Sequence, residues 1–201
     1  MRSDYIGLIK QKISDSQPGT VFVYSDFANI ANAATVRQNL NRLAKEKAIR
    51  KIKNGVFEKP AYSNLLKEML PVNPDSVAKA IARNFHWTIS PSGNYALNIL
   101  GLSNQVPAVW SYISDGPYKE YKIGDIKIEY KHRTNREISG MSDVTILVVQ
   151  GLKALGKEHV DGQVIKILSE KLKSEDKKII LKEATESSEW IYAIIKKVCE
   201  V

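Results

Sequence analysis

The chain has 201 residues and only one cysteine, Cys199. A single cysteine excludes an intrachain disulfide and a cysteine-rich metal site, and it suits a reducing compartment. The sequence also lacks a charged-then-apolar signal pattern at its start. Its longest apolar candidate, Val144–Gln150, is much shorter than the ~20 residues needed to cross a membrane. We therefore expect a cytoplasmic protein that does not associate with membranes.

Motifs for catalysis and cofactor binding are scarce. Gly93 and the other glycines stand alone, so the chain has no glycine-rich phosphate loop. Ser90 and Ser92 lie outside any nucleophile-elbow pattern, and helix capping explains them better. The histidines, which are far apart in the sequence, are His86, His132 and His159. We expect no zinc site, no other cofactor and no enzymatic activity.

Positive charge is concentrated near the N-terminus. The chain carries a formal net charge of +8. Residues 1–60 hold 11 Lys and Arg against 5 Asp and Glu, a net of +6, whereas residues 61–201 hold 19 against 17, a net of +2. A surplus confined to one segment indicates that a polyanion binds there.

The elements expected in this basic segment follow the order of a winged helix-turn-helix domain. Ser3 is expected to cap a helix that runs to about Ile13, and Thr20–Tyr24 is a β-rich run. Ser25 then caps a short helix over Asp26–Ile30, and a longer helix follows over Ala33–Lys47. Together they predict a winged-helix domain at 1–60.

The helix over residues 33–47 has one apolar face. Its apolar positions are Val36, Leu40, Leu43 and Ala44. At about 100° per residue, the opposite face then carries polar side chains suited to DNA. After this helix, Ile49–Ile52 and Val56–Glu58 predict two strands around an Asn54-Gly55 hairpin turn, and Pro60 ends the second strand.

These two elements supply our candidate DNA contacts. Gln38 and Asn41 can bond adenine, whereas Arg37 and Arg42 can bond guanine in the major groove. Lys45 and the hairpin cations are better suited to phosphate or to the minor groove. The complete predicted set is Thr35, Arg37, Gln38, Asn41, Arg42, Lys45, Arg50, Lys51, Lys53 and Asn54. A single winged helix covers little DNA, so we also expect a homodimer on a repeated or inverted operator site.

The rest of the chain predicts a connector and a mixed α+β domain. Residues 61–74 are the expected connector, with a short helical stretch over Tyr62–Met69 before a proline-bounded break. The second domain, 75–201, is expected to open with a helix over Asp75–Phe85 and another over Ser92–Leu100. An antiparallel β-meander and C-terminal helices then follow. The meander strands are Ala108–Ile113, Tyr118–Ile123 and Ile126–His132, and the helices cover Ser142–Leu155 and about 162–172, 175–185 and 188–198. The predicted fold class is α+β.

Three segments resemble the AbiEi-like antitoxin family. They are Ala34–Pro60 (ATVRQNLNRLAKEKAIRKIKNGVFEKP), Thr88–Pro107 (TISPSGNYALNILGLSNQVP) and Val149–Gly156 (VQGLKALG). Two positions depart from the family pattern: Ala48 stands where glycine is common, and Phe57 replaces the usual tyrosine. The resemblance implies a transcriptional regulator that binds double-stranded operator DNA, represses its own operon and counteracts a nucleotidyltransferase-like toxin through its second domain.

Two other functions remain open from the sequence. Asp115 followed by Glu129 and Lys131 on one strand face is typical of restriction-endonuclease-like nucleases, whose carboxylates hold Mg²⁺. However, Asp115-Gly-Pro also predicts a simple turn. A winged helix can instead serve as an adaptor that binds only proteins.

Overall fold

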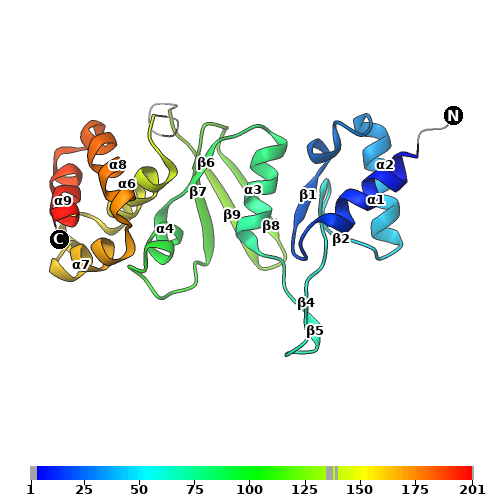
Figure 1. Cartoon of the computed structure of the whole chain (residues 1–201), viewed down its shortest axis with the longest axis horizontal. Coiled ribbons are helices and arrows are strands. Elements are labelled where there is room, and N and C mark those ends of the chain that lie inside the picture. The colour runs from blue at the N-terminus through cyan, green and yellow to red at the C-terminus, as the bar shows by residue number, and fades with distance from the viewer. Residues whose placement is uncertain (1–3, 135–137, 139, 201) are drawn as a thin grey trace. The chain divides into compact units, whose positions relative to one another are not determined.

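The computed structural model describes residues 4–134, 138 and 140–200. It has the expected mixed α+β composition (Figure 1). The chain divides into two compact units, Met1–Trp87 and Thr88–Val201, which we call the first and second units. Among the described residues, no helix combines the length and apolar character that crossing a bilayer would need.

The first unit has the element order of a winged helix. Its elements are α1 (Tyr5–Asp15), β1 (Val21–Val23), the 3₁₀ helix η1 (Tyr24–Phe27), α2 (Ala33–Lys45), β2 (Arg50–Lys53) and β3 (Val56–Glu58). The three strands form one antiparallel sheet in the order β1-β3-β2. The β2–β3 hairpin is the wing, and Gly55 adopts φ 84° in its turn, a left-handed conformation that glycine tolerates.

A single apolar core holds these elements together. Ile9 of α1, Phe27 of η1, Leu40 of α2 and Phe57 of β3 are fully buried in it. The apolar face predicted for α2 is therefore the face that packs inward. This packing fixes the direction in which the polar residues of α2 point.

The ends of the helices differ in detail from the sequence prediction. Asp4 caps α1 by accepting a hydrogen bond from the Gly7 N–H at 3.0 Å; Ser3, the expected cap, lies outside the described residues. The expected helix over residues 26–30 is replaced by the shorter η1. Asp26, not Ser25, accepts the Val23 N–H at 2.8 Å.

The end of α2 is a Schellman motif. The Ala48 N–H donates to the Leu43 carbonyl at 3.0 Å and the Lys47 N–H donates to the Ala44 carbonyl at 3.1 Å. Lys47 takes the left-handed position of this motif, with φ 59°. The helix therefore stops at Lys45, two residues before its predicted end.

The expected helical stretch over residues 62–69 is wrong. The chain forms a two-stranded hairpin there, β4 (Tyr62–Ser63) with β5 (Glu68–Met69). The Ser63 hydroxyl accepts the Leu66 N–H at 3.2 Å, and Lys67 turns the chain with φ 54°. These local bonds favour a turn over a helix.

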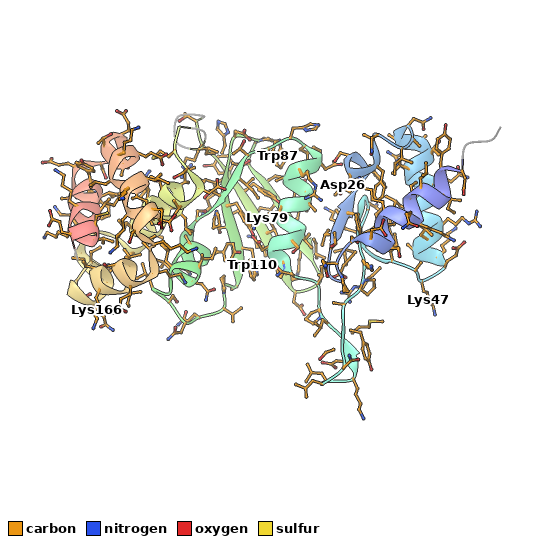
Figure 2. All side chains as sticks on the ribbon, viewed as in Figure 1. Asp26, Lys47, Lys79, Trp87, Trp110 and Lys166 are labelled. Carbon is orange, nitrogen blue, oxygen red and sulfur yellow. The ribbon has the colours of Figure 1, made fainter. Side chains whose placement is uncertain are left out.

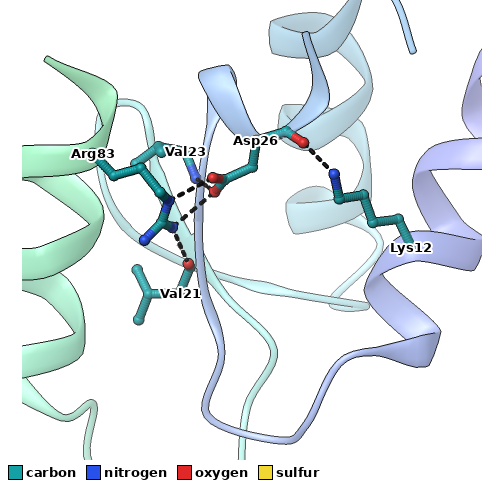
Figure 3. Close-up of polar contacts among 5 residues, drawn as sticks. All are labelled: Lys12, Val21, Val23, Asp26 and Arg83. Carbon is teal, nitrogen blue, oxygen red and sulfur yellow. Dashed lines mark hydrogen bonds and ion pairs between the residues drawn. The ribbon is translucent and has the colours of Figure 1, made fainter. Parts of the chain in front are cut away.

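Helix α3 (Pro74–Asn84) belongs to the first unit, although the sequence predicts that a second domain begins at residue 75. It packs against β1, η1 and β3. Arg83 of α3 forms a bidentate ion pair with Asp26, with Nε and Nη2 at 2.6 and 3.0 Å from the carboxylate oxygens (Figure 3). Arg83 also donates to the Val21 carbonyl at 3.1 Å, and Lys12 donates to the Asp26 carbonyl. The hydrogen bonds to Asp26 raise the pKa of the Arg83 guanidinium above its usual value.

The second unit contains a four-stranded sheet whose topology differs from the predicted meander. Its elements begin with β6 (Ile89–Pro91), α4 (Gly93–Leu100), β7 (Val109–Ser114), β8 (Lys119–Ile123) and β9 (Ile126–His132). The strand order is β6-β7-β9-β8, and β7 pairs with β9 in parallel. The predicted antiparallel pairing of β8 with β9 is confirmed, but the predicted pairing of β7 with β8 is wrong, because the chain after β7 crosses the end of β9: His132 Nδ1 lies 2.9 Å from the Gly116 carbonyl oxygen.

The C-terminal helices pack into a separate apolar core. They are α6 (Asp143–Leu155), η2 (Lys157–His159), α7 (Gly162–Lys171), α8 (Ser174–Glu183), η3 (Ala184–Glu186) and α9 (Glu189–Glu200). Leu152, Leu168, Ile180 and Ile191 are buried at the centre of this core. The predicted positions of these helices are confirmed to within a few residues.

Candidate nucleic-acid interface

Helix α2 carries six of the predicted DNA-contact residues and presents four of them outward. Val36, Leu40 and Leu43 are at most 1% exposed, so the opposite face meets solvent. The exposed members of the predicted set on this helix are Arg37, Gln38, Arg42 and Lys45, with Thr35 and Asn41 partly buried. Thr35 lies in the first turn, where its N–H donates to the Asn32 cap at 2.9 Å.

A groove separates α2 from the wing. Its volume is about 320 Å³, and it is lined by Tyr24, Arg37, Asn41, Lys51, Asn54 and Gly55. Four of these residues are in the predicted DNA-binding set, two from the helix and two from the wing. The structure therefore brings together side chains that are 17 positions apart in the sequence, from Arg37 to Asn54.

The groove residues outside the predicted DNA-binding set are Tyr24 and Gly55, and Tyr24 is the one to which the sequence gives no role. The Arg37 guanidinium lies over its ring, with 5.4 Å between the guanidinium carbon and the ring centroid. The same ring packs against buried Phe57, with centroids 6.1 Å apart. Tyr24 therefore orients Arg37 by a cation–π contact from the edge of the core. The sequence offers no signal for this role, because an aromatic residue ending a β-rich run predicts only packing.

Gly55 lets the wing approach Tyr24 closely. A Cβ atom at position 55 would lie 3.2 Å from the Tyr24 ring, and φ is already left-handed there. Gly55 is therefore required both by the turn and by the close approach to Tyr24.

Asn41 ties the helix to the wing. Its Oδ1 accepts a hydrogen bond from Lys51 Nζ at 3.2 Å, and its Nδ2 donates to the Arg37 carbonyl at 2.8 Å. Both ends of the amide are thus engaged inside the protein. In this arrangement Asn41 positions Lys51, whereas the sequence predicts that it contacts adenine.

Arg42 forms an ion pair with Glu46 on the surface of α2. Its Nε donates to Glu46 Oε1 at 2.8 Å, and Lys10 approaches the other Glu46 oxygen at 3.8 Å. The hydrogen bond from Arg42 lowers the pKa of Glu46. Arg42 remains 63% exposed, so the pair can open toward a stronger anion.

Arg50 and Lys53 occupy different settings on β2. Arg50 forms an ion pair with Glu58, whose side chain is 2% exposed, and it donates to the Leu70 carbonyl at 2.9 Å. Its charge therefore compensates a buried carboxylate and supports the hairpin at residues 62–69. Lys53 is partly buried next to a register shift between residues 51 and 53. Neither Arg50 nor Lys53 lines the groove between α2 and the wing.

A family model matches residues 8–180 of the chain. The chain belongs to the family of unknown function DUF6088. The DUF6088 match runs from α1 to α8 and so includes the groove and the sheet of the second unit. No curated protein matches the chain.

The residues of the nuclease pattern also lie within the DUF6088 match. Glu129 and Lys131 share one face of β9, as predicted, and form an ion pair at 3.4 Å. Asp115 is not brought to them. Glu129 is level with Ser111, so Asp115 lies about 13 Å further along the sheet, where its carboxylate accepts the Thr88 N–H at 2.9 Å. Within the part of the chain that the structure describes, no three His, Cys, Asp or Glu side chains gather as a metal site.

Proposed function

We propose that this protein is a DNA-binding transcriptional regulator that contacts duplex DNA with α2 and the wing. One observation carries the proposal: the groove between these elements is lined by two cations, Arg37 and Lys51, and by two amide side chains, with no carboxylate among its lining residues. Cations bind phosphates, and amides can bond phosphates or base edges.

The surrounding charge supports this proposal. Lys45 and Lys47 are exposed beside the end of α2, and Lys47 is labelled in Figure 2. The outward face of α2 also carries Gln38 and Arg42, whose side chains match adenine and guanine edges in the major groove. A helix with a narrow apolar seam on its inner face and long polar side chains on its outer face has the dimensions of a major-groove reader.

We further propose that this regulator is an antitoxin. The resemblance to AbiEi-like antitoxins supports it, and two of the three similar segments, at residues 88–107 and 149–156, lie in the second unit. On this proposal the second unit counteracts a nucleotidyltransferase-like toxin. A reading frame for such a toxin beside the gene would support this role, and its absence would leave a regulator without a toxin.

The DNA-binding proposal is tested by selecting duplexes from a random library and measuring affinity over a salt series. Lys51→Ala should weaken binding to every duplex and reduce the slope of log K against log salt by about 1, because one phosphate contact is lost. Gln38→Ala should instead remove about 1–3 kcal/mol of preference for the selected sequence.

Lys166→Ala is the matched control for these variants. Lys166 is an exposed lysine on α7, also labelled in Figure 2, and its loss should leave both the affinity and the salt slope unchanged. The proposal fails if the folded wild-type protein binds no duplex at low salt. It also fails if Lys51→Ala and Lys166→Ala behave alike.

A further inference from the structure

The second unit contains a cationic cavity that the DNA-binding proposal does not use. Its volume is about 420 Å³, and its polar lining consists of Ser92, Gly93, Lys131, Arg133, Gln150 and Lys153. They come from the start of α4, the end of β9 and the last turns of α6. The apolar remainder includes Ile113, which lies opposite Lys131 in the parallel β7–β9 pair and so faces the same side of the sheet.

The cavity holds a buried hydroxyl that lacks a hydrogen-bond partner. Ser92 is 4% exposed, and its Oγ makes no hydrogen bond in the described part of the structure. The sequence predicts Ser92 as a helix cap, and it does occupy the N-cap position of α4, yet its hydroxyl makes no capping bond. A buried hydroxyl of this kind costs free energy unless a ligand or water satisfies it.

The start of α4 adds a second feature that suits an anion. The first N–H groups of a helix have no partner within the helix, and the positive end of the helix dipole lies there. Gly93 is the first helical residue, has φ 58°, a left-handed conformation that glycine tolerates, and lines the cavity. Backbone N–H groups at such a terminus bind phosphate and carboxylate groups.

The charged side chains that line the cavity are all cationic. Lys131, Arg133 and Lys153 contribute three cations to the lining. Glu129 is the adjoining carboxylate: it pairs with Lys131 at 3.4 Å and accepts the Ser111 hydroxyl at 3.1 Å. Arg133 donates to the His132 carbonyl at 2.8 Å, which holds its guanidinium at the rim. No carboxylate is among the described residues that line the cavity, so the side chains that would meet a ligand there are cationic or neutral.

We propose that this cavity binds the phosphoryl group of a small phosphomonoester. The phosphoryl oxygens would accept hydrogen bonds from the Ser92 hydroxyl and the first N–H groups of α4, while Lys131 and Lys153 balance their charge. The cavity is larger than free phosphate requires and falls in the range of small-molecule sites, about 300–1,000 Å³, so it has room for the organic part of a mononucleotide-sized ester.

Calorimetric titration of the full chain at constant ionic strength tests this proposal with adenosine 5′-monophosphate, inorganic phosphate and adenosine. Adenosine monophosphate should bind, phosphate should bind more weakly, and adenosine should not bind up to about 10 mM. Ser92→Ala should weaken binding of the monophosphate about fivefold or more, and Lys131→Gln with Lys153→Gln about tenfold or more. Stronger binding of free phosphate than of the ester would restrict the site to the inorganic ion and overturn the phosphomonoester assignment.

Two variants control for charge and burial. Ser90 is also buried with an unpartnered hydroxyl but does not line the cavity, so Ser90→Ala should change the affinity less than about twofold. Lys166→Gln should behave likewise. Equal losses in Ser92→Ala and Ser90→Ala would overturn the proposal, provided that both variants keep the wild-type circular dichroism spectrum.

Binding measurements with duplex DNA distinguish this proposal from the proposed function. The cavity variants should bind selected duplexes as the wild type does, because α2 and the wing are in the first unit. If a duplex displaces the monophosphate and the cavity variants lose DNA affinity, these cations bind a nucleic-acid backbone and the small-ligand proposal is wrong. Loss of DNA binding in Lys51→Ala, with monophosphate binding intact, would keep the two sites distinct.

Discussion

Lys47 combines an unfavourable backbone conformation with an exposed cation. The Schellman motif at the end of α2 requires a left-handed residue there, and a side chain makes that conformation costly. The left-handed backbone of Lys47 turns the chain from α2 toward the wing, and β2 begins three residues later at Arg50. The sequence places lysine where most helices with this ending have glycine.

Replacing Lys47 with glycine should therefore stabilise the first unit. We expect Lys47→Gly to raise the free energy of unfolding by about 0.5–1 kcal/mol, because the left-handed strain is relieved although the unfolded chain gains some freedom. Urea denaturation followed by circular dichroism measures the change. Lys47→Ala removes the same charge but keeps the strain, so a similar gain in that variant would contradict this explanation.

Individual residues also show why part of the candidate DNA interface could be predicted from the sequence and part could not. The outward direction of Gln38 and Arg42 follows from the 3.6-residue period of their own helix. The role of Arg50 depends on Glu58 across the wing, and that of Arg37 depends on the Tyr24 ring beneath it. Such roles come from tertiary contacts that no local pattern encodes.

At the scale of elements, α8 provides the cap of α6. The carboxylate of Glu183, the last residue of α8, accepts hydrogen bonds from the Ser142 N–H at 2.8 Å and from the Ser142 and Thr145 hydroxyls at 2.6 Å. Burial alone would raise the pKa of Glu183, but these hydrogen bonds outweigh it and lower the pKa below the ordinary value of 4.5. An anion at the start of α6 also suits its dipole.

This contact should make the second unit sensitive to acid. Because the folded-state pKa is below the unfolded value, the stabilisation is present above about pH 4.5 and is lost as the pH falls through the folded pKa. We expect Glu183→Gln to cost about 1 kcal/mol at pH 7 and progressively less below pH 4.5, since the site is partly exposed. Urea unfolding at a series of pH values measures the difference.

Glu158→Gln is the control for this series, because Glu158 is an exposed carboxylate on η2. It should leave the pH dependence of unfolding close to that of the wild type. An unchanged gap between wild type and Glu183→Gln from pH 7 to pH 3 would contradict the role given to the Glu183 charge.

Among the helices and strands, some could be predicted from local sequence patterns and others could not. Helices α4 and α6 were predictable because Gly101 and Gly156, both with positive φ, mark their ends. The pairing of β7 with β9 was not, since strand periodicity gives the faces of a strand but not its neighbours. The hairpin at residues 62–69 was missed because its apolar residues are spaced like those on one face of a helix. Such a face would be buried against the protein, but Leu65 is 91% exposed in the hairpin.

At the scale of the whole molecule, the division after Trp87 makes α3 part of the winged-helix unit. Helix α3 contacts β1, η1 and β3, and Arg83 is bound to Asp26. A fragment ending at Pro60, the predicted domain boundary, would lose all of these contacts.

We therefore expect residues 1–87 to unfold cooperatively as an isolated fragment and residues 1–60 not to do so. Thermal unfolding followed by circular dichroism distinguishes a sigmoidal transition from a gradual one. Residues 88–201 should also unfold cooperatively by themselves. A sharp transition in the 1–60 fragment, at the same temperature as in 1–87, would show that α3 is dispensable.

The strand order of the second unit has a consequence for synthesis. Strand β9 lies between β7 and β8 but follows both in the sequence, and it contributes the buried Ile128 and Tyr130 to the sheet. As the nascent chain leaves the ribosome, β7 and β8 emerge before the strand that must separate them. The sheet can close only after His132 has emerged, so the backbone N–H and C=O groups on one edge of β7 stay unpaired with β9 while translation continues.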